Sequence, residues 1–396
     1  MIVRQFLQWV RNAPAGERAE ATGALARAYL YSELSADDAA AAEGAMLMLL
    51  DDPSPLVRRA LADALAASPS APPAVVHALA GDQPQIAAPV LALSPLLVDA
   101  DLVDAVATGG PSVQAAIASR AALPPAVSAA IAEVGTGEAC LILIENPGAD
   151  IAPCSIDRIV ERFGHLAAIR EPLLQRDDLA AATRLTLVTK LSETLAGFVT
   201  GRNWLGAEHA RRVTREACEK ATISLAAEAP DGELRPLIRH LCESGQLTAG
   251  LILRALLSGN VTLFEEALAE LSEMPISRVS GLIYGGGFGG LRALFDKAGL
   301  PASTYPAFKA AIEAMREGGF VGDAGGAAQL KRRMIERVLT SCEADEFGEM
   351  APPLITLLHR FATEAAREEA RMFCDNVVTD DVVADDFVAD PQPLAA

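Results

Sequence analysis

The residues whose spacing is most suggestive of ligand chemistry are glycines. Gly285, Gly287 and Gly290 fit the pattern G-x-G-x-x-G and come before a helix that we expect over residues 291–298. The free N–H groups at such a helix start can hold a phosphate. A dinucleotide-binding motif also requires a strand before the glycines and an acidic residue about 20 residues after them, but residues 277–284 can form a short helix instead. The glycines therefore indicate either a small-ligand site or a flexible turn with close packing between helices.

Basic side chains form a second candidate site, for an anion or an acidic segment of a partner. They are Arg202, Arg211, Arg212, Arg215 and Lys220, and Trp204 lies among them. Arg211 and Arg215 share a helix face because residues four apart are neighbours on a helix. The alternative is a solvated helix face on which Glu216 and Glu219 neutralise the arginines.

Metal-binding and catalytic patterns are missing from the sequence. His240 and Cys242 are two residues apart, and His209 lies nine residues before Cys218, whereas ligands on one helix face should be three or four apart. The sequence has no paired C-x-x-C motif, no H-E-x-x-H and no G-x-S-x-G. We therefore expect no catalytic site, no metal and no cofactor, and a protein that is not an enzyme. Acid–base pairs that are distant in sequence stay open.

The elements that carry these residues are predicted from prolines and from a repeat. Of the 24 prolines, 14 lie between residues 53 and 172, and proline favours the first position of a helix. The positions Ser68, Ser94, Ser119 and Asn146 are spaced by 26, 25 and 27 residues and each follows an apolar run. A short helix, a turn and a second short helix repeated at this period predict an α-solenoid, because stacked copies bury a continuous core. The alternative is an alanine-rich helical bundle.

The whole chain is predicted to be all-α, an α-solenoid followed by a bundle of longer helices. We expect N-terminal capping helices over residues 1–50, repeats of about 26 residues over 51–190, a C-terminal helical domain over 191–320 and terminal helices over 321–374. Residues 375–396 contain six aspartates and no basic residue. They are predicted to form a disordered acidic tail.

Charge and composition exclude several classes of function. The chain has 33 basic and 52 acidic residues, a net charge of −19, which repels nucleic acids and anionic lipids. No run of 18 uncharged apolar residues occurs, and the apolar start of the chain is interrupted by Arg4, so we expect neither membrane insertion nor a signal peptide. Six widely spread cysteines favour reduced thiols and a cytoplasmic location.

A resemblance adds a fold expectation. Residues 51–82 look like HEAT-like and leucine-rich-variant helical repeats, in which Asp52, Val57 and Arg58 match the repeats' Asp and Val-Arg positions. Over residues 50–320 the chain is similar to an uncharacterised bacterial family with a domain of unknown function. This resemblance implies stacked helices and almost no biochemistry.

The architecture leads to two hypotheses about function. A solenoid offers an extended surface for protein partners, so we expect a bacterial scaffold or regulatory adaptor that acts through protein–protein contacts. The alternative is a sensor of a small ligand or nucleotide that uses residues 285–290 and 202–220. The identity of the partner and the oligomeric state are open.

Overall fold

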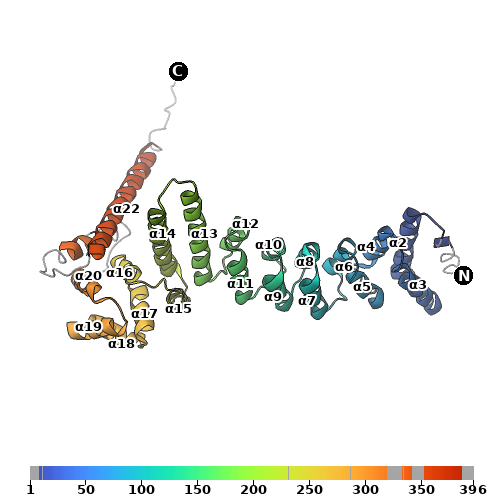
Figure 1. The fold of residues 1–396 in the computed structure, drawn as a ribbon, viewed down its shortest axis with the longest axis horizontal. Coiled ribbons are helices and arrows are strands. Elements are labelled where there is room, and N and C mark those ends of the chain that lie inside the picture. Colours follow the sequence, from blue (N-terminus) through green and yellow to red (C-terminus); the bar gives the residue numbers. More distant parts are fainter. Residues whose placement is uncertain are drawn as a thin grey trace, which may run out of the picture. The chain divides into compact units, whose positions relative to one another are not determined.

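The computed structural model describes residues 9–10, 12–230, 232–285, 287–318, 332, 334–340 and 352–385. The chain divides into two compact units, Met1–Arg202 (unit 1) and Asn203–Ala396 (unit 2). Figure 1 shows that the described residues form helices, and within them we find no strand beyond an isolated bridge between Leu123 and Ala149. The predicted all-α fold class is confirmed.

Unit 1 consists mostly of short helices, and half of those described begin at proline. The sequence analysis predicted such starts, and α4, α5, α6, α8, α9 and α11 each have proline in the first turn. The helices are α2 (Ala15–Tyr31), α3 (Ala36–Leu49), α4 (Pro55–Leu65), α5 (Pro73–Ala80), α6 (Pro84–Leu93), α7 (Asp99–Thr108), α8 (Pro111–Ala118), α9 (Pro125–Val134), α10 (Gly137–Glu145), α11 (Pro153–Phe163), α12 (Ala167–Leu174) and α13 (Ala181–Gly201).

The helices of unit 1 stack in two layers. In one layer each of α2, α4, α6, α8, α10 and α12 contacts the next, and in the other α7, α9, α11 and α13 do the same (Figure 1). Leu65, Leu91 and Leu143 are at most 1% exposed in the shared core. Each of these leucines lies three residues before one of the repeated turn positions, Ser68, Ser94 and Asn146, and points into the core.

Hydrogen bonds between consecutive turns explain the spacing of the repeat. Arg120 donates to the carbonyl oxygens of Leu91 and Ser94, at 2.6 and 2.8 Å. Asn146 donates in the same way to Ala118 and Arg120, at 2.8 and 2.7 Å. The last carbonyl groups of a helix have no partner within the helix. A polar side chain about one repeat later satisfies them here, so the turns must recur at a nearly constant interval.

Asp52 and Arg58, two of the residues that carry the resemblance to helical repeats, form ion pairs with residues of neighbouring repeats. Arg18 contacts Asp52 at 2.8 Å, and Arg58 contacts Asp82 at 2.6 Å. Burial raises the pKa of Asp52, but hydrogen bonds from Arg18 and the Ser54 N–H outweigh it, so the pKa lies below its ordinary value. The ionised carboxylate is therefore the form that stabilises this end of the stack.

Unit 2 contains helices of varied length around an aromatic core. They are α14 (Ala207–Glu228), α15 (Leu234–Glu243), α16 (Ala249–Leu257), α17 (Val261–Ser272), α18 (Ile276–Tyr284), α19 (Phe288–Lys297), α20 (Tyr305–Gly318) and α22 (Pro352–Asp385), with a short 3₁₀ helix at Ala302–Thr304 and a helical segment over residues 334–340. Phe308 is the centre of the core, with its ring centroid 4.8 Å from that of Phe295 and 6.1 Å from that of Phe264.

Two predicted segment boundaries differ from the observed helices. The helix α13 spans residue 190, where the sequence analysis divided the chain, and the division into units follows the end of α13. The helix α22 runs to Asp385, so residues 375–385 are helical where a disordered tail was predicted. Adding residues to an existing helix avoids the cost of nucleation, which the charge argument neglected. Residues 386–396 lie outside the described residues.

Candidate functional site

The first half of α14 is an exposed helical segment. Among residues 207–215 Ala210 alone is buried, although Thr214 is partly covered. Arg211, Arg212 and Arg215 are all exposed here, so the structure places three of the predicted basic residues together. Arg202 is the C-cap of α13 in unit 1, with its guanidinium carbon 5.1 Å from the ring centroid of Phe198.

The arginines of this segment are not neutralised in the way that the alternative interpretation expected. Arg212 donates to Nδ1 of His209 at 2.6 Å. Arg211 and Arg215 make no hydrogen bond or ion pair within the described part of the chain. Glu216 and Glu219, which were expected to neutralise them, bind arginines from other helices. The charges of Arg211 and Arg215 therefore face solvent without a bound carboxylate.

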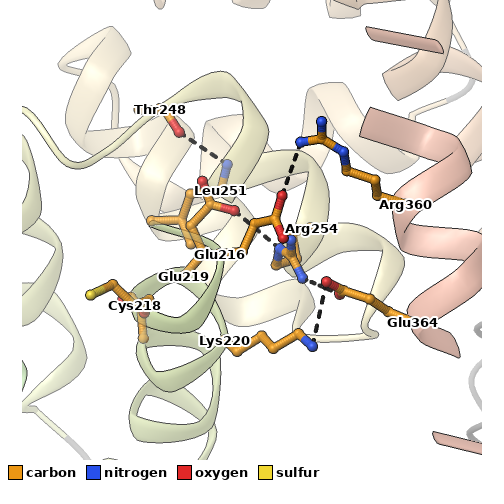
Figure 2. Close-up of polar contacts among 10 residues, drawn as sticks. Glu216, Cys218, Glu219, Lys220, Thr248, Leu251, Arg254, Arg360 and Glu364 are labelled. Carbon is orange, nitrogen blue, oxygen red and sulfur yellow. Dashed lines mark hydrogen bonds and ion pairs between the residues drawn. The ribbon is translucent and has the colours of Figure 1, made fainter. Parts of the chain in front are cut away.

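An ion network anchors the second half of α14, and Figure 2 shows it. Arg254 of α16 donates from Nε to Glu219 at 3.2 Å and from Nη1 to Glu364 of α22 at 2.6 Å. Lys220 Nζ lies 3.4 Å from the second oxygen of Glu364, and Arg360 donates to Glu216 at 2.9 Å. Carboxylates on α14 and α22 thus share one buried guanidinium, which fixes α14 to its neighbours.

Burial makes the network sensitive to the loss of either charge. The Arg254 side chain is 7% exposed and its guanidinium carbon lies 4.2 Å from the ring centroid of Phe361. Burial raises the pKa of Glu219, and the opposing attraction of Arg254 does not fully offset this.

The sequence analysis missed Arg254, Arg360 and Glu364 as members of a site. The only local signal was the run of charges at 216–220, which does not identify partners 35 and 110 residues from Arg254.

Apolar side chains are exposed beside the arginines. Trp204 is 65% exposed, Leu205 38% and Val213 45%. Tryptophan and arginine are the residue types most enriched where protein partners bind tightly. We call Trp204, Leu205, Arg211, Arg212 and Arg215 together the 204–215 surface; Val213 is left out because residues two apart on a helix do not face the same side.

The predicted glycine site has the geometry of a turn between two helices. It follows α18 rather than a strand, and α19 begins at Phe288. Gly285 and Gly287 have φ of −71° and −99°, which other residues adopt readily. A Cβ on Gly285 would clash with the carbonyl oxygen of Gly281, one on Gly290 would lie 2.9 Å from Leu282 Cδ2, and one on Gly287 would meet nothing. Local packing thus accounts for Gly285 and Gly290.

The glycine turn and the arginines do not converge. Both belong to unit 2, where Figure 1 shows α18 and α19 at the end opposite to the first turns of α14. Among helix pairs with extensive contacts, α14 contacts α17, and α18 and α19 contact α17 and each other. A single ligand site built from both features is therefore not formed.

Other kinds of site were sought over the described residues. No group of three or more histidine, cysteine or acidic side chains there could hold a metal ion. None of the helices in that part of the chain has the length and apolar character needed to cross a membrane. The stack of unit 1 has an open groove of about 570 Å³ between α2 and α4, lined by small residues and by Glu20, Arg27, Tyr31 and Asp63.

Comparison with known proteins identifies the family. The model of a family described as an uncharacterised protein conserved in bacteria, DUF2336, matches residues 86–346. The chain belongs to this family. The match covers most of the two-layer stack and the part of unit 2 that includes the 204–215 surface. No curated protein and no solved structure matches the chain.

Proposed function

We propose that this DUF2336 protein is a non-catalytic adaptor that binds an acidic, partly apolar segment of a protein partner at the 204–215 surface. The observation that carries the proposal is the combination of exposed Trp204 with Arg211 and Arg215, which have no ion pair among the described residues. In this view the two-layer stack of unit 1 is a HEAT-like solenoid, which supports the surface and offers further area for partners.

The charge of the chain favours a protein partner over other polyanions. With a net charge of −19, the molecule as a whole repels the dense charge of nucleic acids and anionic membranes. A short acidic segment needs only a local patch of arginines, and its apolar side chains can cover Trp204 and Leu205. Glu208 on the same half of α14 favours a segment with spaced rather than continuous negative charge, since like charges repel.

The ion network contributes by holding the surface in place. Arg254 ties the second half of α14 to α16 and α22, so the exposed first half extends from a fixed base. A surface that is ordered before binding loses less entropy when the partner arrives. We therefore expect the first half of α14 to bind without a large rearrangement.

A peptide-binding titration tests this proposal. The probe is a fluorescein-labelled peptide of alternating leucine and aspartate pairs, and the variant is Arg211→Glu/Arg215→Glu. The matched control is Arg278→Glu/Lys297→Glu, which reverses two cations that are exposed and lack an ion pair among the described residues. We expect binding to weaken by at least about tenfold, or 1.4 kcal/mol, in the α14 variant and to stay unchanged in the control.

Two outcomes would contradict the proposal. Equal weakening in the α14 variant and the control would mean that the peptide responds to net charge alone. Binding to vesicles of anionic lipid that depends on Arg211 and Arg215, together with no binding of the acidic peptide, would assign the surface to a membrane instead.

A further inference from the structure

The end of the chain carries a short repeat whose chemistry is complementary to the 204–215 surface. Residues 377–381 read Val-Val-Thr-Asp-Asp, residues 382–386 read Val-Val-Ala-Asp-Asp, and residues 387–391 read Phe-Val-Ala-Asp-Pro. Each five-residue repeat has two large apolar side chains followed, after one residue, by one or two aspartates. No lysine or arginine follows Arg371, so every charge in this segment is negative.

This pattern is complementary to the surface in both apolar area and charge. The valine pairs and Phe387 offer apolar area for Trp204, and the aspartates offer carboxylates for Arg211 and Arg215. Hydrogen bonds between arginine and carboxylate are stronger than those between neutral groups. An acidic segment without apolar residues could pair only with the arginines of the surface, and an apolar segment without charge could cover only its apolar side chains.

The tether to α22 keeps the segment close to the surface. Glu364 of α22 binds Arg254 and lies 3.4 Å from Lys220 of α14, so α22 is held beside the second half of α14. In Figure 1 the last turns of α22 and the first turn of α14 both lie toward the upper edge of unit 2. Of the repeat, residues 386–391 follow the end of α22 at Asp385 and can span up to about 20 Å when extended. The apolar core of unit 2, as far as it is described, uses α22 only up to Ala365.

We propose that residues 377–391 bind the 204–215 surface of their own chain and compete there with the acidic partner. This inference rests on the proposed function of that surface. A short tether gives an effective local concentration in the millimolar range, so even a weak intramolecular contact excludes most of a dilute competitor. The segment acts as an internal occupant that a partner must displace.

The test compares three chains with one probe, a fluorescein-labelled peptide of residues 377–391. The chain that ends at Asn376 should bind the peptide, and the full chain should bind it at least about tenfold more weakly, a difference of 1.4 kcal/mol. A full-length variant with Asp380, Asp381, Asp385, Asp386 and Asp390 changed to asparagine should bind the peptide as the shortened chain does. This variant keeps the length of the chain, so it covers the case in which the shortened chain folds poorly.

Changes on α14 locate the binding. Arg211→Glu/Arg215→Glu in the shortened chain should abolish binding of the peptide, whereas Arg278→Glu/Lys297→Glu should not. Equal affinity of the full and shortened chains, or peptide binding that does not depend on Arg211 and Arg215, would overturn the inference. So would a full-length dimer, measured by sedimentation, that dissociates when the repeat is removed, because the occupant would then be a second copy.

The two proposals fail in different ways. If the shortened chain binds the leucine–aspartate peptide at the 204–215 surface but not the peptide of residues 377–391, the internal occupant is refuted and the adaptor function stands. If the shortened chain binds neither peptide, the adaptor function itself is refuted. The shortened chain is therefore the form in which both peptides should be compared.

Discussion

Replacing Arg254 with methionine should destabilise unit 2 more than other single changes to its charged residues. The Arg254 side chain is 7% exposed, and its partners Glu219 and Glu364 are 14% and 22% exposed, so all three charges are largely withdrawn from water. Removing one partner of a buried ion pair costs roughly 3–5 kcal/mol because the other charge is left unpaired. Lys220 remains 3.4 Å from Glu364. We therefore expect the free energy of unfolding to fall by an amount near the lower end of this range, about 3 kcal/mol.

Urea unfolding measures this loss. The loss of helical circular dichroism follows the unfolding, because the described part of unit 2 is mostly helical. The triple variant Arg254→Met/Glu219→Gln/Glu364→Gln leaves no buried charge without a partner in the network. We expect it to recover at least half of the lost stability, because the penalty of an unpaired buried charge is then removed. A loss below about 1 kcal/mol in the single variant, against the roughly 3 expected, or a triple variant no more stable than the single one, would refute this account of the network.

Three further predictions concern unit 1. Replacing the buried leucines of the repeat with alanine should lower the free energy of unfolding by about 2–5 kcal/mol each in urea titrations; these are Leu65, Leu91 and Leu143. Losses under about 0.5 kcal/mol at all three positions, far below the usual range, would reject the repeat alignment. Arg120→Ala leaves the carbonyl groups of Leu91 and Ser94 without their donor and should lower stability by about 1–3 kcal/mol, whereas an unchanged midpoint would show that water replaces the guanidinium. The pKa of Asp52 is lowered in the folded state despite the opposing effect of burial, so its contribution is present above the unfolded pKa of about 3.9 and is lost as the pH falls through the folded value. Asp52→Asn should therefore be less stable at pH 7 and less sensitive to acid, and parallel pH profiles of the two chains would contradict this.

The fold was predictable from the sequence where a local rule decides the structure. Proline favours helix starts through its fixed φ and missing N–H, and α4 and α9 begin at Pro55 and Pro125 in agreement with this general rule. The turns at Ser94 and Asn146 were predicted from their regular spacing, which hydrogen bonds from one turn to the next maintain in the structure. The end of α22 was not predicted, because charge repulsion was weighed without the low cost of extending an existing helix.

The candidate site was predictable only in part. The arginines of α14 were found because they are close in sequence and contrast with an acidic chain. The Arg254 network was missed because its members are 35 and 110 residues apart, and no local pattern connects them. For the glycine motif the sequence already indicated that the strand required for dinucleotide binding is missing, and α18 occupies that position.

A charge-exchange binding matrix tests the central claim, that the 204–215 surface recognises an acidic segment. Two chains ending at Asn376, one unchanged and one with Arg211→Glu/Arg215→Glu, are each titrated with the leucine–aspartate peptide and with the same peptide carrying lysine for aspartate. The account predicts that the unchanged chain binds the acidic peptide, that the reversed chain binds the lysine peptide, and that both affinities fall as salt screens the exposed charges. It is contradicted if the acidic peptide binds the two chains with equal affinity.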